Sequence, residues 1–325
     1  MPARSSALSR LGRRDRRDFP WVAPTWPAGV YRPPPKRRLG VEYPTAWARR
    51  YPARLARAVM LDNLIRPAAH LVTSPQVRGE EALEFVESPA IFVANHSSHV
   101  DTLVLLSVLP ARFRHNTVVA AAADHFFDRA WKAHLWAFAL ALVPIERHRV
   151  NRKSAELATE LLESGWNLLI YPEGGRSHDG WFGEFKAGAG YLAKRTGRPL
   201  VPVHIAGTFH VLARGSNRIQ RSPVTVTFGA PIKVREDEDA RAAATRIEEA
   251  VAVLADESAT DLWSALRRAG AGRTPSPQGP AASPWRRAWA LRQPRQDYGQ
   301  EQRWALESPV SWRRRTSLVR RASRT

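Results

Sequence analysis

The sequence predicts an α/β fold with a largely parallel central sheet flanked by helices, a basic arm before it and a basic tail after it. Three observations support this prediction. Apolar residues make up 44% of the 325 residues, which is enough for a sizeable core. Short apolar segments alternate with helical patterns, as they do in βαβ units. Segments rich in proline and arginine stand near the two ends of the chain.

The folded domain is expected over residues 51–260, after a Pro/Arg-rich arm at 1–50 that reads as extended or disordered. Its first element is a helix at 52–72, where apolar residues recur at helical spacing and Pro67 predicts a kink. Strands are expected at the short apolar runs 90–95, 117–123, 142–146, 167–171, 200–205 and 224–228.

Helical patterns fill the intervals between these strands. The best signalled helix starts after Asn151, which can cap it, and stops at Gly165. The other helices are expected at 101–109, 126–140, 188–196 and 240–255. Residues 271–325 are rich in Pro, Gly, Ser, Arg and Trp, which predicts a disordered basic tail.

Charge is concentrated at the ends of the chain. Residues 1–60 hold 14 basic and 3 acidic groups, a net +11, and residues 265–325 hold the same numbers. Residues 61–264 hold 22 basic and 24 acidic groups, a net −2. The excess of positive charge therefore belongs to the ends and not to the expected core.

Composition and hydropathy exclude several classes of site. The chain has no cysteine, which excludes a disulfide scaffold, a thiolate zinc site and a cysteine nucleophile. The longest apolar run, 135–145, contains Pro144 and is about half of the ~20 residues that span a bilayer. No apolar stretch follows the first arginines, so no signal peptide is expected. Any membrane contact is expected from the surface.

The first polar cluster runs from Asn95 to Asp101, directly after an expected strand. Ligands of open α/β sheets bind at the carboxyl ends of strands. A carboxylate at Asp101 can hold one ring nitrogen of His96 and leave the other free as a general base. Two other interpretations stay open: a helix cap by Ser97 or Ser98 beside a plain loop histidine, and, less favoured, a metal site that includes His99.

The second cluster, Tyr171 to Ser177, follows another apolar strand. Its two glycines allow the backbone to approach a ligand closely, and Arg176 offers a planar fork that suits phosphate. Ser177 adds a hydroxyl, and Glu173 can accept bonds from substrate hydroxyls or hold the arginine. Taken alone, the cluster also fits a turn with a surface ion pair.

Together the two clusters resemble the lysophosphatidic acid acyltransferase family, whose glycerolipid acyltransferases carry the order Asn-His-x4-Asp and then Pro-Glu-Gly-x-Arg-Ser. Here these are Asn95 to Asp101 and Pro172 to Ser177. Further blocks in register are 144–147, 185–188 and 201–205, so the resemblance covers about residues 75–235. One departure is Gly175, where many members have threonine, and it leaves the identity of the acceptor open.

The resemblance implies a reaction and a role for each matching residue. His96 would be the general base on the acceptor hydroxyl, and Asp101 would orient it and stabilise its cation. The glycerol-phosphate part of the acceptor would be bound by Glu173, Gly174, Arg176, Ser177 and Arg147. The acyl donor would be acyl-coenzyme A or an acyl carrier protein, the acceptor 1-acyl-glycerol-3-phosphate and the product phosphatidic acid, a step of phospholipid biosynthesis. No metal and no cofactor is implied.

The setting expected for this reaction is the cytoplasmic, inner face of the cell membrane, with the protein bound peripherally. The Trp/Arg-rich tail suits anionic headgroups, and the apolar segment 131–145 could either lie at the interface or form a buried core helix. Nonspecific nucleic-acid binding and plain solvation are alternatives for the tails. Two alternatives to the reaction remain: another lysolipid or glycolipid acceptor, and a non-catalytic basic lipid- or nucleic-acid-binding protein on the same scaffold.

Overall fold

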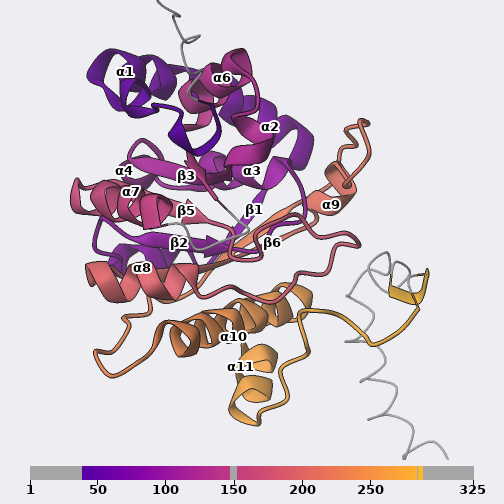
Figure 1. The fold of residues 1–325 in the computed structure, drawn as a ribbon. Coiled ribbons are helices and arrows are strands. Elements are labelled where there is room, and N and C mark those ends of the chain that lie inside the picture. Colours follow the sequence, from indigo (N-terminus) through magenta and orange to yellow (C-terminus); the bar gives the residue numbers. More distant parts are fainter. Residues whose placement is uncertain (1–38, 147–151, 284, 288–325) are drawn as a thin grey trace, which may run out of the picture. The chain divides into compact units, whose positions relative to one another are not determined.

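The computed structural model describes residues 39–146, 152–283 and 285–287 (Figure 1). Seven strands form one sheet in the order β1-β7-β6-β2-β5-β3-β4. Every neighbouring pair is parallel except β6 and β7, which are antiparallel. The strands are β1 (Gln76–Arg78), β2 (Ile91–Ala94), β3 (Thr117–Ala122), β4 (Leu142–Ile145), β5 (Asn167–Ile170), β6 (Leu200–Ala206) and β7 (Thr225–Phe228). The largely parallel sheet that the sequence predicts is confirmed.

Helices cover both faces of the sheet. The α-helices are α1 (Tyr51–Met60), α2 (Arg66–Thr73), α3 (Val100–Val108), α4 (Ala111–Arg114), α5 (Ala123–Phe126), α6 (Ala130–Leu140), α7 (Arg152–Glu163), α8 (Gly188–Thr196), α9 (Thr208–Val211), α10 (Ala240–Ala259) and α11 (Leu262–Gly270). In Figure 1, α1, α2 and α6 lie above the strands, and α8, α10 and α11 lie below them. Short 3₁₀ segments are η1 (Gly40–Glu42), η2 (Ala46–Arg49) and η4 (Glu80–Phe85).

The central strand β2 shows why the core has two layers. Its four residues are fully buried, and their side chains alternate between the two faces of the sheet. Phe92 and Ala94 pack in the cluster that contains Leu105 of α3, whereas Ile91 and Val93 pack in the cluster that contains Leu161 of α7. A strand buried on both faces reads as a continuous apolar run, which is the pattern that the sequence shows.

The expected elements differ from the observed ones mainly in short segments. The helix expected at 52–72 is continuous but passes through a π-helical turn, η3 (Leu61–Ile65), before α2, and Pro67 lies in the first turn of α2. Because the helix runs on without a break, Pro67, which has no N–H, cannot donate to the preceding turn, and the π-helical turn lies directly before α2. Strand β1 was not expected, because three residues are too few to show a period.

Residues at both ends of the expected domain pack onto it. The sequence assigns residues 39–50 to the basic arm, yet Tyr43 and Ala48 are buried against the core cluster that contains Phe127. It assigns 271–287 to the tail, yet Arg287 forms an ion pair with Asp179. Two arginine-rich segments thus contribute packing and pairing side chains that their composition alone does not reveal. The domain boundaries at 51 and 260 stay predictions.

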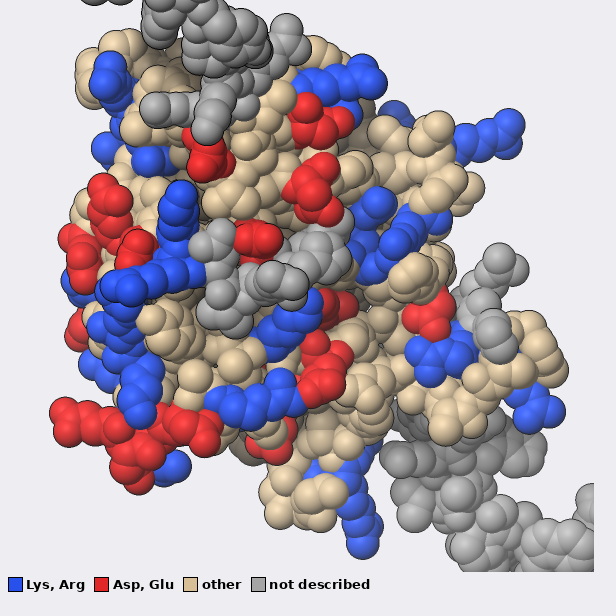
Figure 2. All heavy atoms as spheres, viewed as in Figure 1, with Lys and Arg blue, Asp and Glu red and all other residues tan. Residues whose placement is uncertain are grey.

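The described residues carry charges of both signs on their surface, as expected from the near-zero net charge of residues 61–264. On the face shown in Figure 2, Lys and Arg side chains lie interspersed with Asp and Glu side chains. Within the described residues, no helix combines the length and the apolar character needed to cross a membrane.

The order of the strands brings the two polar clusters together. Strand β2 lies directly beside β5 and runs parallel to it, with Val93 opposite Ile170. The residues that follow these two strands, 95–101 and 171–177, therefore leave the same edge of the sheet side by side. This is the position at which open α/β sheets bind ligands.

Candidate active site

His96 and the buried Asp101 form a hydrogen-bonded pair at this edge. The Nδ1–H of His96 donates to Oδ2 of Asp101 at 2.8 Å, and the carboxylate is fully buried. The same oxygen accepts the backbone N–H groups of Ser97 and Ser98, each at 2.8 Å. These bonds fix the carboxylate and the Nδ1–H tautomer of the imidazole. The Nε2 atom has no hydrogen-bond partner among the described residues, and the side chain is 16% exposed.

Of the three interpretations of this cluster, the geometry favours the pair. The helix α3 begins at Val100, so Asp101 lies in its first turn, where its carboxylate can turn back to the preceding loop. His99 stacks on His125, with ring centroids 5.5 Å apart, and among the described residues it forms no hydrogen bond to the Asp101 carboxylate. No group of three or more His, Asp or Glu side chains is arranged to hold a metal ion in the part of the chain that the structure describes.

Tyr171 supports the histidine from the neighbouring strand end, and sequence reasoning missed it. Its ring stacks on the His96 ring with centroids 4.2 Å apart and an angle of 22° between the planes. Its hydroxyl shares a 2.9 Å hydrogen bond with Thr102. Burial, with a smaller contribution from the charge of Asp101, raises the pKa of Tyr171 well above its ordinary value. The signal in the sequence is one aromatic residue at the end of the strand beside β2, which is too weak by itself.

Glu173 holds the loops of the site together. Its Oε1 accepts the backbone N–H of His96 at 2.6 Å, and its Oε2 accepts the N–H of Gly183 at 2.9 Å. Burial raises the pKa of Glu173 to about 8, and the two backbone donors act in the opposite direction. The sequence suggests that this carboxylate holds the arginine or bonds a substrate hydroxyl. In the structure its oxygens already bind backbone groups, and no ion pair joins it to Arg176.

Gly174 and Ser177 shape the loop around Arg176. Gly174 has φ +73°, a backbone conformation that favours glycine, so a residue with a Cβ would be strained there. Ser177 donates its backbone N–H to the His96 carbonyl at 2.8 Å. Its hydroxyl oxygen accepts the N–H of Gly180 at 2.8 Å. Both residues thus fix the backbone beside the histidine.

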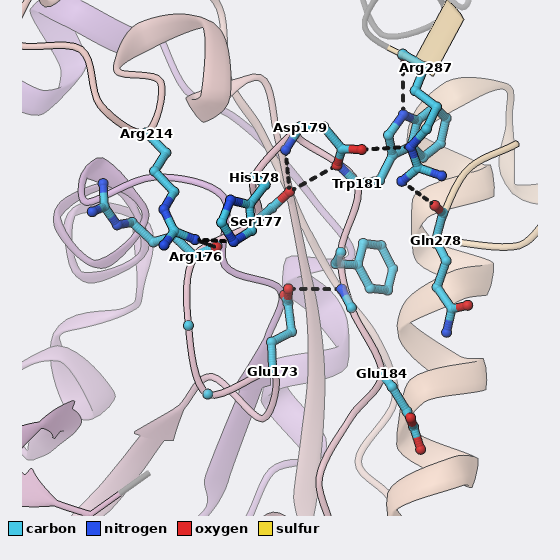
Figure 3. A pocket seen from close by; sticks show the side chains of 14 residues that line it. Glu173, Arg176, Ser177, His178, Asp179, Trp181, Glu184, Arg214, Gln278 and Arg287 are labelled. Carbon is cyan, nitrogen blue, oxygen red and sulfur yellow. Dashed lines mark hydrogen bonds and ion pairs between the residues drawn. The ribbon is translucent and has the colours of Figure 1, made fainter. Parts of the chain in front are cut away.

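Arg176 lines a pocket of about 620 Å³ next to this loop (Figure 3). The pocket is also lined by Arg214 from the segment between β6 and β7, and by residues 278 and 287 near the end of the described chain. The sequence-predicted residues Glu173, Gly174 and Ser177 line it too. Arg147, the second phosphate ligand that the resemblance implies, lies outside the described residues.

The segment that closes one side of this pocket comes from the stretch that the sequence assigns to the tail. Arg287 donates from Nε to Asp179 at 2.6 Å, and Trp181 donates from Nε1 to the Arg287 carbonyl at 3.3 Å. Gly279 lies directly against the Trp181 ring, where a Cβ would come within 2.3 Å. The Trp181 ring therefore packs against Gly279, and the charge of Asp179 is balanced by Arg287. The Pro- and Gly-rich composition conceals these contacts.

Comparisons with known proteins agree with the residue patterns. The family model described as Acyltransferase matches residues 74–206. A 1-acyl-sn-glycerol-3-phosphate acyltransferase of Cocos nucifera is 29% identical over 49% of this chain and 51% of its own length. A chloroplastic one of Arabidopsis thaliana is 32% identical over 48% of this chain and 43% of its own length. The chain thus spans about half the length of these curated relatives.

A solved structure supports the fold. The 1-acyl-sn-glycerophosphate (LPA) acyltransferase PlsC from Thermotoga maritima superposes with a TM-score of 0.52 at 22% identity, covering 63% of this chain and 81% of that one. The matched residues 74–206 contain both polar clusters together with the strands β2 and β5 that position them. Residues 74–206 of the chain are therefore a domain of the acyltransferase family.

Proposed function

We propose that the chain is an acyltransferase that moves a fatty acyl group from an acyl thioester to the hydroxyl of a lysophospholipid. The proposed acceptor is 1-acyl-glycerol-3-phosphate, the acceptor in the names of its curated relatives, and the product is phosphatidic acid. The observation that carries this proposal is the pair of His96 with the buried Asp101, which leaves the Nε2 atom of His96 free, inside a domain of the acyltransferase family.

The proposed mechanism uses His96 as base and then as acid. Nε2 takes the proton from the acceptor hydroxyl while the oxygen attacks the thioester carbonyl. The tetrahedral intermediate collapses, the carbon–sulfur bond breaks, and the imidazolium returns the proton to the leaving thiolate. Asp101 stabilises the imidazolium through the Nδ1–H bond and holds the ring in the required tautomer. This acyl transfer changes no oxidation state.

The acceptor's glycerol phosphate is proposed to bind on the loop that carries Glu173, Gly174, Arg176 and Ser177, with Arg147 as a second phosphate ligand. Arg176 is the side chain whose planar fork suits a phosphate. Glu173 and Ser177 serve chiefly by holding the loop, since their oxygens accept backbone N–H groups. The donor is proposed to be acyl-coenzyme A or an acyl carrier protein.

The reaction is tested by incubating purified full-length protein with labelled acyl-coenzyme A, and separately with labelled acyl carrier protein, in the presence of a panel of lysolipids. Label in phosphatidic acid is the expected result. Label in a different lipid would show that the acceptor is another lysolipid. Gly175, where many family members have threonine, is the position at which a different acceptor preference could arise. If no lipid acquires label from either donor, the proposed reaction is wrong and a binding role on this scaffold takes its place.

Arg176→Lys tests phosphate recognition. Lysine keeps the positive charge but loses the two parallel donors of the guanidinium. We expect the KM for 1-acyl-glycerol-3-phosphate to rise by about tenfold, the effect of losing about 1.4 kcal/mol of a charge-assisted bond, with little change in the donor KM. Initial rates at varied acceptor and varied donor measure both constants. A defect confined to the donor KM would place Arg176 on the thioester side of the site.

A second prediction concerns the proposed membrane setting, the inner face of the cell membrane with the protein bound from the cytoplasm. Residues 288–325 hold nine arginines against three acidic residues, with tryptophans at 289, 304 and 312. Deleting them leaves Arg287 and its ion pair with Asp179 in place. We expect the truncated protein to bind anionic vesicles more weakly at low salt, because each basic residue near such a surface contributes roughly 1 kcal/mol.

Vesicle co-sedimentation at two salt concentrations measures this difference, which should shrink as salt rises because surface charges are screened beyond ~10 Å at 0.1 M. Neutral vesicles serve as the control and should show little change. If full-length and truncated proteins bind anionic vesicles equally at low salt, the tail is not the electrostatic anchor. Docking would then be assigned to the apolar segment 131–145.

A further inference from the structure

Arg214 is held beside the Arg176 loop by two hydrogen bonds. It lies after α9, in the connection from β6 to β7, where no motif of the sequence points to it. Its Nη1 donates to the backbone carbonyl of Arg176 at 2.9 Å and to Nε2 of His178 at 2.8 Å (Figure 3). These bonds place a second guanidinium on the wall of the pocket that Arg176 lines. Its Nε and Nη2 atoms have no hydrogen-bond partner among the described residues.

The two guanidinium groups lie close enough to repel each other. Partial burial, and next the positive charge of Arg214, lower the pKa of Arg176. The charge of Asp101 acts on this pKa in the opposite direction, and Asp179 of the same loop is already paired with Arg287 at 2.6 Å. In the part of the chain that the structure describes, neither Arg176 nor Arg214 forms an ion pair with an acidic side chain. Two like charges on one wall without a counterion favour an anion between them.

Arg176 lies on a loop that contacts the backbone of the proposed general base, His96, and Arg214 is bonded to that loop. Ser177, the residue after Arg176, donates its backbone N–H to the carbonyl of His96, so the arginine loop and the histidine share a backbone contact. The charge of Arg176 also reaches His99, whose pKa is lowered to about 4, first by burial and then by that charge. An anion on the two arginines would thus sit on the loop that bonds the backbone of the general base, a position that suits the phosphate of a small acceptor.

We propose that Arg214 determines acceptor specificity by binding, together with Arg176, the phosphate monoester of the acceptor. The inference rests on the proposed function and extends it to a residue outside the motifs. Arg214 uses Nη1 to hold the Arg176 loop and keeps its remaining donors for the ligand. Two guanidinium groups from separate segments match a dianionic phosphate monoester better than the monoanionic diester of other lysolipids.

The test compares Arg214→Ala and Arg214→Gln with the wild type. We expect both variants to raise the KM for 1-acyl-glycerol-3-phosphate by about tenfold or more, with kcat and the donor KM unchanged, because a hydrogen bond to a charged group is lost. The matched control is Arg218→Ala. Arg218 is an exposed arginine of the same connection. Among the described residues, its backbone N–H donates a hydrogen bond to Ser216 and its guanidinium makes none. It should leave all constants unchanged.

The glutamine variant separates ligand binding from loop anchoring. Glutamine keeps an N–H donor that can bond the loop, on a side chain two atoms shorter than that of arginine, and carries no charge. If Arg214→Gln behaves as the wild type while Arg214→Ala does not, the residue only anchors the loop and the proposal is wrong. A rise confined to the donor KM would also overturn it, because the bound phosphate would then belong to the donor.

Calorimetric titration with glycerol 3-phosphate makes the test independent of turnover. We expect Arg214→Gln to weaken its binding by about tenfold or more relative to wild type, and Arg218→Ala to bind as wild type does. If the wild type transfers no acyl group but shows this pattern, the phosphate site stands and the proposed reaction fails. If the wild type transfers acyl groups and all three proteins bind glycerol 3-phosphate equally, the reaction stands and the role of Arg214 fails.

Discussion

His96→Ala should lower kcat for acyl transfer by about 10²–10⁴-fold, the usual contribution of a positioned general base. The reason is that Nε2 is the ring nitrogen of His96 left free to take the hydroxyl proton, since Nδ1–H is held by the carboxylate at 2.8 Å. Alanine also leaves the backbone N–H of residue 96 to donate to Glu173, so the loop should keep its shape. Initial rates with labelled acyl-coenzyme A and thermal unfolding measure both effects.

The control for this variant is His99→Ala. His99 lies three residues away, and its ring stacks on the ring of His125 and not on His96. Burial, the charge of Arg176 and two neighbouring histidines lower its pKa to about 4, so at neutral pH its removal changes no charge in the site. We expect a mild effect on kcat. An inactive His99→Ala protein together with an active His96→Ala protein would reverse the assignment.

The sequence predicts the strands that position this site better than it predicts the side-chain contacts within it. A strand that is buried on both faces, such as β2 or β5, is recognisable as a continuous apolar run, and parallel strands bring their carboxyl ends to one edge of the sheet. That both polar clusters lie at one edge of the sheet therefore follows from local patterns. That they lie side by side depends on the pairing of β2 with β5, which the structure shows.

The contacts between these clusters are not local and leave no comparable pattern. The stacking of Tyr171 on His96 and the bonds from Glu173 to two loops depend on the order of the strands across the sheet, which the sequence does not reveal. Arg214 reaches the Arg176 loop from a connection 38 residues later in the chain. Such side chains are found only when tertiary structure places them together.

Composition misleads at the ends of the domain for a related reason. A stretch rich in Pro, Gly and Arg lacks the apolar content to fold alone, which is why 271–287 was assigned to the tail. A few specific contacts with an existing domain suffice to place it, here the Arg287–Asp179 pair and the packing of Gly279 on Trp181. The same holds for Tyr43 and Ala48, which pack on a core formed by other segments.

Asp101→Asn should lower kcat by about 10²–10⁴-fold while leaving the acceptor KM nearly unchanged. The carboxylate contributes only as the imidazolium forms, and replacing such a group by an amide costs about 10⁴ in kcat in the Ser-His-Asp enzymes. The substitution is close to isosteric. Oδ2 accepts three hydrogen bonds that the amide oxygen can retain, from His96 and from the backbone of Ser97 and Ser98.

The amide nitrogen would take the place of Oδ1, which is buried and has no hydrogen-bond partner among the described residues. A buried unpaired donor costs about 1–3 kcal/mol, so we expect a lower melting temperature but a folded protein. The control is Asp128→Asn. It removes a carboxylate from the exposed Asp128–Lys132 pair and should alter neither kcat nor stability by much.

The double variant His96→Ala/Asp101→Asn decides whether Asp101 acts through the histidine. If it does, the double variant should be no slower than His96→Ala alone, because a carboxylate cannot stabilise an imidazolium that never forms. Losses that multiply would show that Asp101 contributes independently, by holding the loop at Ser97 and Ser98 or by acting on the substrate. Far-ultraviolet circular dichroism of all three proteins distinguishes these two causes, since only the first disturbs the start of α3. Multiplied losses with an unchanged spectrum would require a different chemical role for this buried carboxylate.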